Sequence, residues 1–219
     1  MVSDTIQFVF ENKIQKIRNA DSNKTILNYI RNDLKKIGTK EGCAEGGCGA
    51  CTIALGELNK NKIIYKAINA CISFLPILNG KHLILVEDLT NENNKLHPVQ
   101  EAMVKFHGSQ CGFCTPGFTM SLFSMYKNHR TVNKEIIDES LSGNLCRCTG
   151  YRPIIDAAKS LNYKKDEDQF KKNQNKIFNL LKKIKKIDIE LNNKGKKYFA
   201  PKTILSLKKI LKKYPDVKI

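Results

Sequence analysis

The sequence predicts an α+β chain, in which a small domain of strands and one helix precedes a bundle of four helices. Two observations support this prediction. Through residues 1–88 apolar residues alternate with polar ones or form short runs, whereas through residues 89–162 they recur at helical spacing. The chain has 219 residues, which is long enough to bury two small hydrophobic cores.

The domain at residues 1–88 is predicted to open with a β-hairpin, whose turn falls at residues 11–13. Thr25 is placed to cap a helix whose apolar spacing continues to Ile37, and Gly38 is expected to end it. Strands are expected near 52–55, 63–65 and 83–86, with a short helix after Cys71. Together these elements predict a β-grasp fold. The apolar positions of the hairpin are Ile6, Phe8, Phe10, Ile14 and Ile17.

Residues 89–162 are predicted to form four short amphipathic helices. Pro98, Pro116 and Pro153 each stand at a first-turn position, where the missing N–H costs nothing. Asn133 is expected to cap the remaining helix, and Gly143 to end it. Short connections between such helices are typical of a four-helix bundle.

The strongly basic part of the chain lies after the predicted bundle. The formal net charge is +17, and residues 163–219 hold 18 Lys against 6 Asp and Glu, a net +12. We interpret residues 163–197 as a basic linker and residues 198–219 as the beginning of a further domain, with a helix capped by Thr203 and a strand from Asp216. A docking or nucleic-acid role for the basic segment is the alternative.

The sequence has no apolar stretch of membrane-spanning length, and its first ten residues lack the basic region of a signal peptide. We therefore expect a cytoplasmic protein without a membrane partner. The cytosol keeps thiols reduced, so the eight cysteines are expected to bind metal rather than to form disulfides.

Four cysteines follow the spacing C-x4-C-x2-C…C, the arrangement that holds a [2Fe–2S] cluster in plant-type ferredoxins. Glycines around the first three allow the backbone to wrap closely around a cluster. Zinc is the alternative, but tetrahedral zinc favours two C-x2-C pairs, and this spacing fits it poorly. The four residues are Cys43, Cys48, Cys51 and Cys71.

The other four cysteines form a second set with the spacing C-x2-C…C-x-C, and no cysteine is left over. Each pair precedes a predicted helix, whose free N–H groups and dipole favour an anionic thiolate cluster. Taken alone, this set is also compatible with zinc; beside the first set, a second [2Fe–2S] cluster is the better interpretation. The four residues are Cys111, Cys114, Cys146 and Cys148.

No nucleophile–base pair or phosphate-binding glycine loop stands out. The four histidines share no ligand spacing and are interpreted as surface or packing residues; they are His82, His97, His107 and His129. We therefore expect the chain to carry electrons and to have no catalytic residue of its own.

Three long segments resemble the xanthine dehydrogenase family of molybdenum hydroxylases. Residues 38–52 are similar to the family's plant-type cluster loop, and residues 110–118 and 143–153 to its second-cluster motifs. Shorter similarities lie at 69–71, 86–89 and 96–100, so the resemblance covers residues 1–162. It is greatest to the small subunit of bacterial members, and residues 198–219 resemble the opening of the FAD-binding domain that follows in that subunit.

The resemblance implies a function in purine catabolism. Electrons from a molybdopterin centre on a large partner subunit pass through two [2Fe–2S] clusters to FAD and then NAD. It also implies that the second cluster faces the molybdopterin, with Gln110 and Cys148 at that contact. The flavin domain's phosphate loop would lie beyond Ile219, so we expect a truncated subunit that neither binds FAD tightly nor oxidises purines alone.

Two alternatives remain open. The chain could be the iron–sulfur subunit of a hydroxylase that oxidises aldehydes or carbon monoxide; the segment 198–201 argues against it, because such subunits stop soon after the bundle. It could also be a zinc-binding nucleic-acid module, which would need aromatic residues interleaved with basic ones on one face. The aromatic residues after 163 are scattered.

Overall fold

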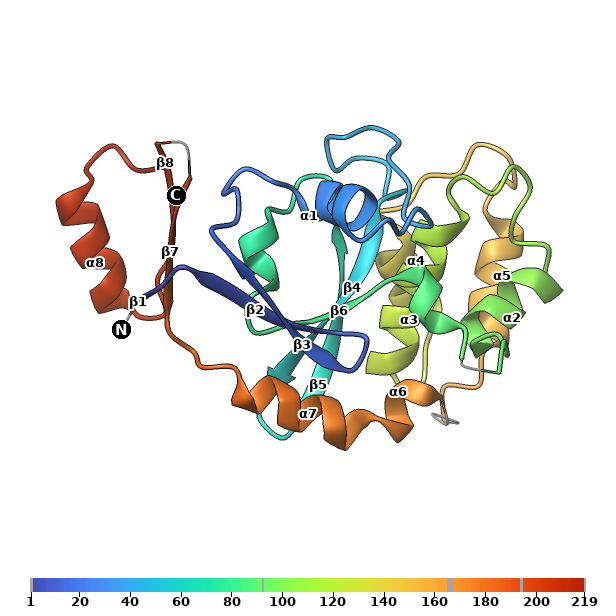
Figure 1. The fold of residues 1–219 in the computed structure, drawn as a ribbon. Helices are drawn as coiled ribbons and strands as arrows, with labels where there is room; N and C mark the ends of the chain where they lie inside the picture. Colours follow the sequence, from blue (N-terminus) through green and yellow to red (C-terminus); the bar gives the residue numbers. More distant parts are fainter. Residues whose placement is uncertain (1, 92, 165–167, 194, 219) are drawn as a thin grey trace.

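A five-stranded sheet lies at the centre of the described residues, with the strand order β3-β2-β6-β4-β5. The computed structural model describes residues 2–91, 93–164, 168–193 and 195–218 (Figure 1). Strand β2 pairs in parallel with β6, and the other neighbours are antiparallel. The strands are β2 (Thr5–Phe10), β3 (Lys13–Arg18), β4 (Thr52–Asn59), β5 (Lys62–Asn69) and β6 (His82–Ile84). The mixed α and β architecture confirms the predicted fold class.

The predicted hairpin is present as β2 and β3, with Phe10 opposite Lys13. Its turn residues Glu11 and Asn12 both have left-handed backbones, with φ of 48° and 60°. Two consecutive left-handed residues match the twist of a two-residue hairpin. The alternating pattern places Ile6 and Phe8 in the core at 0% exposure.

The helix after Thr25 is shorter than predicted. Helix α1 (Ile26–Asn28) begins as expected, since Thr25 Oγ1 accepts a hydrogen bond from the Asn28 amide at 3.1 Å. It continues as one π-helical turn, Tyr29–Asp33, and does not reach Gly38. Lys35 is left-handed (φ 57°), which ends the helix, and Ile37 is 63% exposed. The prediction was wrong here because an apolar residue at the right spacing was taken for part of the helix.

The bundle helices begin where the sequence predicts. A proline stands in the first turn of three of them, and the side chain of Asn133 caps the fourth by accepting from the Ile136 amide at 2.9 Å. Helix α3 is buried over most of its surface because it packs against β4 and β5 on one side and α2 and α4 on the other. The helices are α2 (Pro98–Lys105), α3 (Thr115–Asn128), α4 (Lys134–Leu141) and α5 (Arg152–Ser160).

The segment expected to be a linker is folded. It holds α6 (Gln169–Lys172), α7 (Gln174–Lys183) and β7 (Asp188–Asn193). Helix α7 lies across the lower face of the sheet in Figure 1 and buries Ile177 and Leu181 in a cluster with Val9 and Ile84. The apolar side of α7 therefore covers a sheet face, and its lysines occupy the solvent side.

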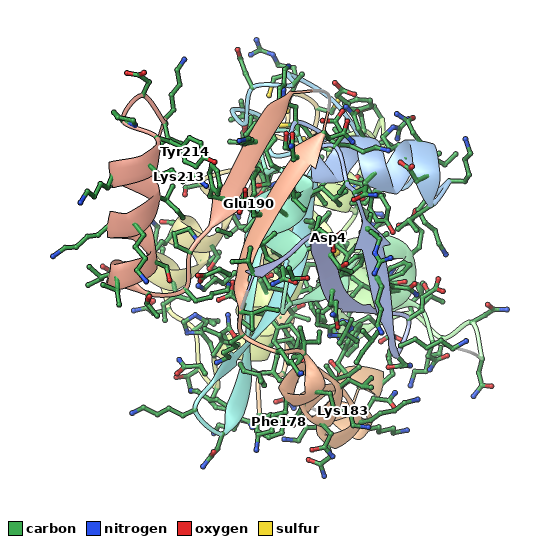
Figure 2. The ribbon with its side chains drawn as sticks, turned by 60° about the vertical axis from the view of Figure 1, so that its left-hand side comes forward. Asp4, Phe178, Lys183, Glu190, Lys213 and Tyr214 are labelled. Atoms are coloured by element: carbon green, nitrogen blue, oxygen red, sulfur yellow. The ribbon has the colours of Figure 1, made fainter. Side chains whose placement is uncertain are left out.

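The end of the described chain pairs with its beginning. Strand β1 (Val2–Ser3) runs parallel to β7, and β7 pairs with β8 (Lys196–Ala200). Helix α8 (Ile204–Lys213), capped by Thr203 as predicted, lies beside this small sheet with Lys213 and Tyr214 at its end (Figure 2). Residues 216–218 form no strand, and Ile219 lies outside the described residues.

Two short 3-10 turns complete the first part of the chain. The turn η2 (Leu75–Leu78) stands where a short helix was expected after Cys71, and η3 (Val86–Leu89) follows β6. In η3 the Glu87 carboxylate accepts from the Gly38 amide at 2.8 Å, which ties the start of the first cysteine loop to the sheet. Among the described helices, none has the length and apolarity that crossing a bilayer requires.

Candidate metal centres

The first cysteine loop wraps its backbone around one sulfur. The Sγ of Cys43 accepts from the amides of Glu45, Gly47 and Cys48 at 3.5, 3.3 and 3.4 Å. These hydrogen bonds favour the thiolate and lower the pKa of Cys43 to about 7. Gly46 supplies a left-handed turn (φ 79°) that brings the amides to the sulfur.

Cys51 and Cys71 lie deeper, at 2% and 9% exposure. Strands β4 and β5 bring them together: Thr52 pairs with Asn69, Cys51 directly precedes Thr52, and Cys71 follows Asn69 by two residues. The two thiols lie within hydrogen-bonding reach of each other, and burial raises the pKa of Cys51 to about 12. A bound cation would reverse that preference, since metal coordination deprotonates a thiol.

The second set of cysteines is more open. Cys111 and Cys148 are exposed and lie beside each other, and Cys114 lies beside Cys146. Burial raises the pKa of Cys114 to about 12. Burial also opposes ionisation of Cys146, but hydrogen bonds from Thr149 outweigh it and bring that pKa to about 7.

Helix starts lie next to this second set, as the sequence predicts. Cys114 is the N-cap residue of α3. Tyr151 caps α5 with a left-handed backbone (φ 69°), and its hydroxyl accepts from the Cys146 amide at 3.0 Å. The amide ends of α3 and α5 thus flank the thiols, where they favour negative charge.

Each of the eight thiols has another thiol as its neighbour, and in the second set the two neighbouring pairs also interact with each other. A [2Fe–2S] cluster is held by four thiolates, two on each iron, whereas a structural zinc needs its four ligands around one ion. Two sets of four thiols, each made of two neighbouring pairs, are compatible with two such clusters. The pairs are Cys43 with Cys48, Cys51 with Cys71, Cys111 with Cys148, and Cys114 with Cys146.

Two cysteine loops touch each other: residues 42–51, which carry Cys43, Cys48 and Cys51, and residues 143–150, which carry Cys146 and Cys148. The Leu145 amide donates to the Cys48 carbonyl at 3.0 Å, and the Asn144 side chain donates to the Gly49 carbonyl at 3.0 Å. Both loops lie at the top of the molecule in Figure 1, above the sheet and the bundle. The two candidate centres are therefore neighbours.

Gln110, expected at a molybdopterin contact, lies exposed in the loop before Cys111. Cys148 is also exposed, so both residues of the expected contact lie on the surface at the second centre. This contact stays a prediction.

Comparison with known proteins gives the chain its family. Residues 9–75 match the 2Fe-2S iron-sulfur cluster binding domain, and residues 85–159 match the [2Fe-2S] binding domain. A xanthine dehydrogenase of Blastobotrys adeninivorans is 53% identical over 145 residues, which is 65% of this chain and 10% of the relative. The chain is homologous to the N-terminal region of the xanthine dehydrogenases. It contains two [2Fe–2S] domains.

The chain is also similar to other oxidoreductases. Aldehyde oxidase 1 of Rattus norvegicus is 44% identical over 161 residues, covering 72% of this chain and 12% of the relative. Quinoline 2-oxidoreductase of Pseudomonas putida 86 superposes with a TM-score of 0.61 at 28% identity, over 73% of this chain and 93% of that one. Aldehyde oxidoreductase of Desulfovibrio gigas gives 0.61 at 31% identity, over 73% of this chain and 17% of that one. The chain spans about a tenth of the length of the curated relatives it matches.

Sequence reasoning missed several contacts that the structure shows within, between and outside the two centres. Asn144 and Tyr151 lie inside the segment 143–153 that resembles the family, yet nothing in the pattern assigned them a contact. His97 was interpreted as a surface or packing residue; it is 2% exposed and hydrogen-bonded to Asp168. The partners of Asn144 and His97 are distant in sequence, so only the fold reveals those contacts. Tyr151 and Cys146 are only five residues apart, but their spacing alone does not indicate a contact.

Proposed function

We propose that this chain is the electron-transfer iron–sulfur unit of a xanthine dehydrogenase-type molybdenum hydroxylase. It receives electrons from a molybdopterin centre on a partner subunit and passes them through two [2Fe–2S] clusters toward FAD and NAD. All eight cysteines serve as ligands. The observation that carries the proposal is the gathering of the eight thiols into two sets of neighbouring pairs, with the Leu145–Cys48 hydrogen bond joining one loop of each set.

When bound, each cluster supplies a one-electron redox couple. The chain's own residues hold the thiolates and set their surroundings. The amides around Cys43 donate to its sulfur, which favours the reduced, more negative state. Burial of Cys51 and Cys71 keeps water away from one side of the first centre.

The difference in exposure supports an order for the two centres. Cys111 and Cys148 lie at the surface, so a partner's cofactor can approach the second centre directly. We propose that this centre faces the molybdopterin, with Gln110 at the contact, and that the first centre lies on the flavin side. Exchanging Gln110 for Ala in the assembled complex should slow reduction of the clusters by the molybdenum centre while leaving both clusters in place. Unchanged reduction kinetics would reject this orientation.

The comparisons support a molybdopterin-binding partner. They do not decide whether this partner is a separate subunit or part of the same chain. The matched region makes up 93% of one solved chain, from quinoline 2-oxidoreductase, and 17% of another, from aldehyde oxidoreductase. We propose a separate large subunit here, and that residues 198–219 belong to a flavin domain. The described residues alone are proposed not to retain FAD. Aldehyde oxidation is the second candidate, because aldehyde oxidase 1 is as similar as several xanthine dehydrogenases.

A redox titration of the reconstituted chain tests electron transfer. Stepwise anaerobic reduction, followed by electron paramagnetic resonance, should reveal two distinct signals, each growing to about one spin per chain. A protein that takes up zinc in stoichiometric amounts and shows no reducible signal would contradict the proposal. In complex with the large subunit, a purine should reduce both clusters and so produce both signals if the purine is the substrate. An aldehyde should do so under the second candidate.

A further inference from the structure

The side chain of Asn144 lies at the joint between the two cysteine loops, at 3% exposure. Its Nδ2 donates to the Gly49 carbonyl at 3.0 Å and to Thr52 Oγ1 at 3.2 Å. Its Oδ1 accepts from Ser121 Oγ, on α3, at 2.6 Å. One amide thus joins the first cysteine loop, the start of β4 and the central helix of the bundle.

Asn144 also lies next to the direct connection between the two centres. Leu145, the next residue, donates its amide to the Cys48 carbonyl at 3.0 Å, and Cys146 follows. A bonded route therefore leads from Cys48 to Cys146 and crosses a single hydrogen bond. The position of the Leu145 amide depends on the residue before it, Asn144, whose side chain is held from both sides by hydrogen bonds.

The joint leaves no room for adjustment. A Cβ added at Gly49 would collide with the Gly143 carbonyl, and one added at Gly117 would collide with the Gly49 carbonyl. The Asn144 Nδ2 would lie 2.5 Å from a Cβ at Gly49 and 3.1 Å from a Cβ at Gly117. The backbones at these two glycines therefore pack tightly against the Asn144 amide. Tight packing of this kind resists small displacements and transmits them to its neighbours.

We propose that Asn144 is a positioning residue for electron transfer: its side-chain amide fixes the separation and the coupling of the two clusters. This inference rests on the proposed function. One electron leaves the cluster of the second set, which is oxidised, and reduces the cluster of the first set; no bond forms or breaks. Because tunnelling and magnetic coupling both fall steeply with distance, a small shift at this joint changes both.

Exchanging Asn144 for Asp tests the proposal with little change in shape. The carboxylate cannot donate to the Gly49 carbonyl and repels it, so the two loops should move apart. In the fully reduced chain we expect a clear loss of the dipolar splitting between the two cluster signals. We also expect slower transfer between the clusters after rapid reduction. Iron content and the two separate signals should match those of the unmodified chain.

Asn128 offers a matched control. Its side chain also joins the bundle to the sheet, because its Oδ1 accepts from the Tyr65 amide at 3.0 Å and its Nδ2 donates to the Tyr65 carbonyl. It stands at the far end of α3, roughly 20 Å along the helix from Cys114. Asn128→Asp should therefore loosen the domain contact and leave the splitting unchanged. An equal loss of splitting in both variants would overturn the proposal.

The outcomes separate this inference from the proposed function. If the unmodified chain binds no clusters, the proposed function fails. If it binds both and Asn144→Asp retains the full splitting, only the inference fails. Should Asn144→Asp not assemble both clusters, Ser121→Ala decides, since it removes one hydrogen bond from the Asn144 amide. A reduced splitting in Ser121→Ala supports the inference, and an unchanged splitting overturns it.

Discussion

His97 donates a hydrogen bond from Nε2 to Asp168 Oδ2 at 2.8 Å, and both side chains are almost completely buried. The tautomer follows from the second nitrogen, because Nδ1 accepts from the Val99 amide at 3.2 Å and caps α2. Lys127, on α3, pairs with the same carboxylate at 3.0 Å. Asp168 begins α6, so this contact ties the segment after the bundle to two bundle helices.

Removing the Asp168 charge should destabilise the whole chain. We expect Asp168→Asn to lower the free energy of unfolding by about 3 kcal/mol, because Lys127 would remain buried beside a neutral amide. Urea unfolding measures the loss. The control is Asp138→Asn, which breaks the exposed pair with Lys134 and should cost less than about 0.5 kcal/mol. Equal losses in the two variants would show that the buried contact is unimportant.

The same contact gives a pH dependence with a definite sign. Burial raises the pKa of Asp168, but the hydrogen bond from His97 and the charge of Lys127 outweigh it and lower the pKa to about 2. A folded-state pKa below the unfolded value stabilises the fold above the unfolded pKa of about 4. That contribution, about 2 kcal/mol, is lost as the pH falls toward about 2. Asp168→Asn should remove this part of the acid sensitivity.

His82 should make the fold sensitive to a milder range of pH. It lies on β6 at 6% exposure with no partner for Nδ1 among the described residues, and burial lowers its pKa to about 4. The neutral ring is favoured in the fold, so the stabilisation is complete above about pH 6.5 and declines as the pH falls toward about 4.

The difference between the unmodified chain and His82→Leu isolates this group from other titrations. Between about pH 7 and pH 5 the unmodified chain should lose about 2 kcal/mol more stability than the variant. Asp88, whose pKa burial raises to about 6, titrates in both proteins and cancels in the comparison. Parallel stability curves for the two proteins would contradict the assignment.

The α7 segment should behave as part of the core. Ile177 is 3% exposed and packs on the sheet, so Ile177→Ala should cost about 3 kcal/mol in urea unfolding. Ile204, on α8, is 75% exposed, and Ile204→Ala should change stability by less than about 0.5 kcal/mol. If Ile177→Ala were as mild as its control, α7 would be a loosely attached linker after all.

Single cysteine exchanges should remove one centre at a time. Cys48→Ser should abolish one cluster signal and leave the other, and Cys114→Ser should do the reverse, since the two belong to different sets. Iron content should fall by about half in each variant. Loss of both signals from either exchange would mean that the two centres do not assemble independently.

Much of the fold follows from local signals that the sequence displays. Proline at Pro98, the caps Asn133 and Thr203, and the β2–β3 hairpin are all read from a few neighbouring residues, and the structure places them as predicted. The spacing of the cysteines likewise identifies two sets without knowledge of the fold. Local spacing failed at Ile37, where a left-handed Lys35 had already ended the helix.

What the sequence could not provide depends on partners far along the chain. Ile177 packs on a sheet face that is formed by residues such as Val9, far away in sequence. The pairing of Val2 with Asp188 and the contact of Leu145 with Cys48 are equally distant. A lysine-rich composition predicts solvation of one helix side and says nothing of what the other side buries.

The most direct test of the central claim is the metal and sulfide content of the chain. After anaerobic reconstitution with iron and sulfide, we predict about four iron and about four acid-labile sulfide per chain, with the visible absorption of [2Fe–2S] clusters. Two [2Fe–2S] clusters, each held by four of the eight cysteines, contain this amount of iron and sulfide. Stoichiometric zinc, without sulfide and without visible absorption, would contradict the account.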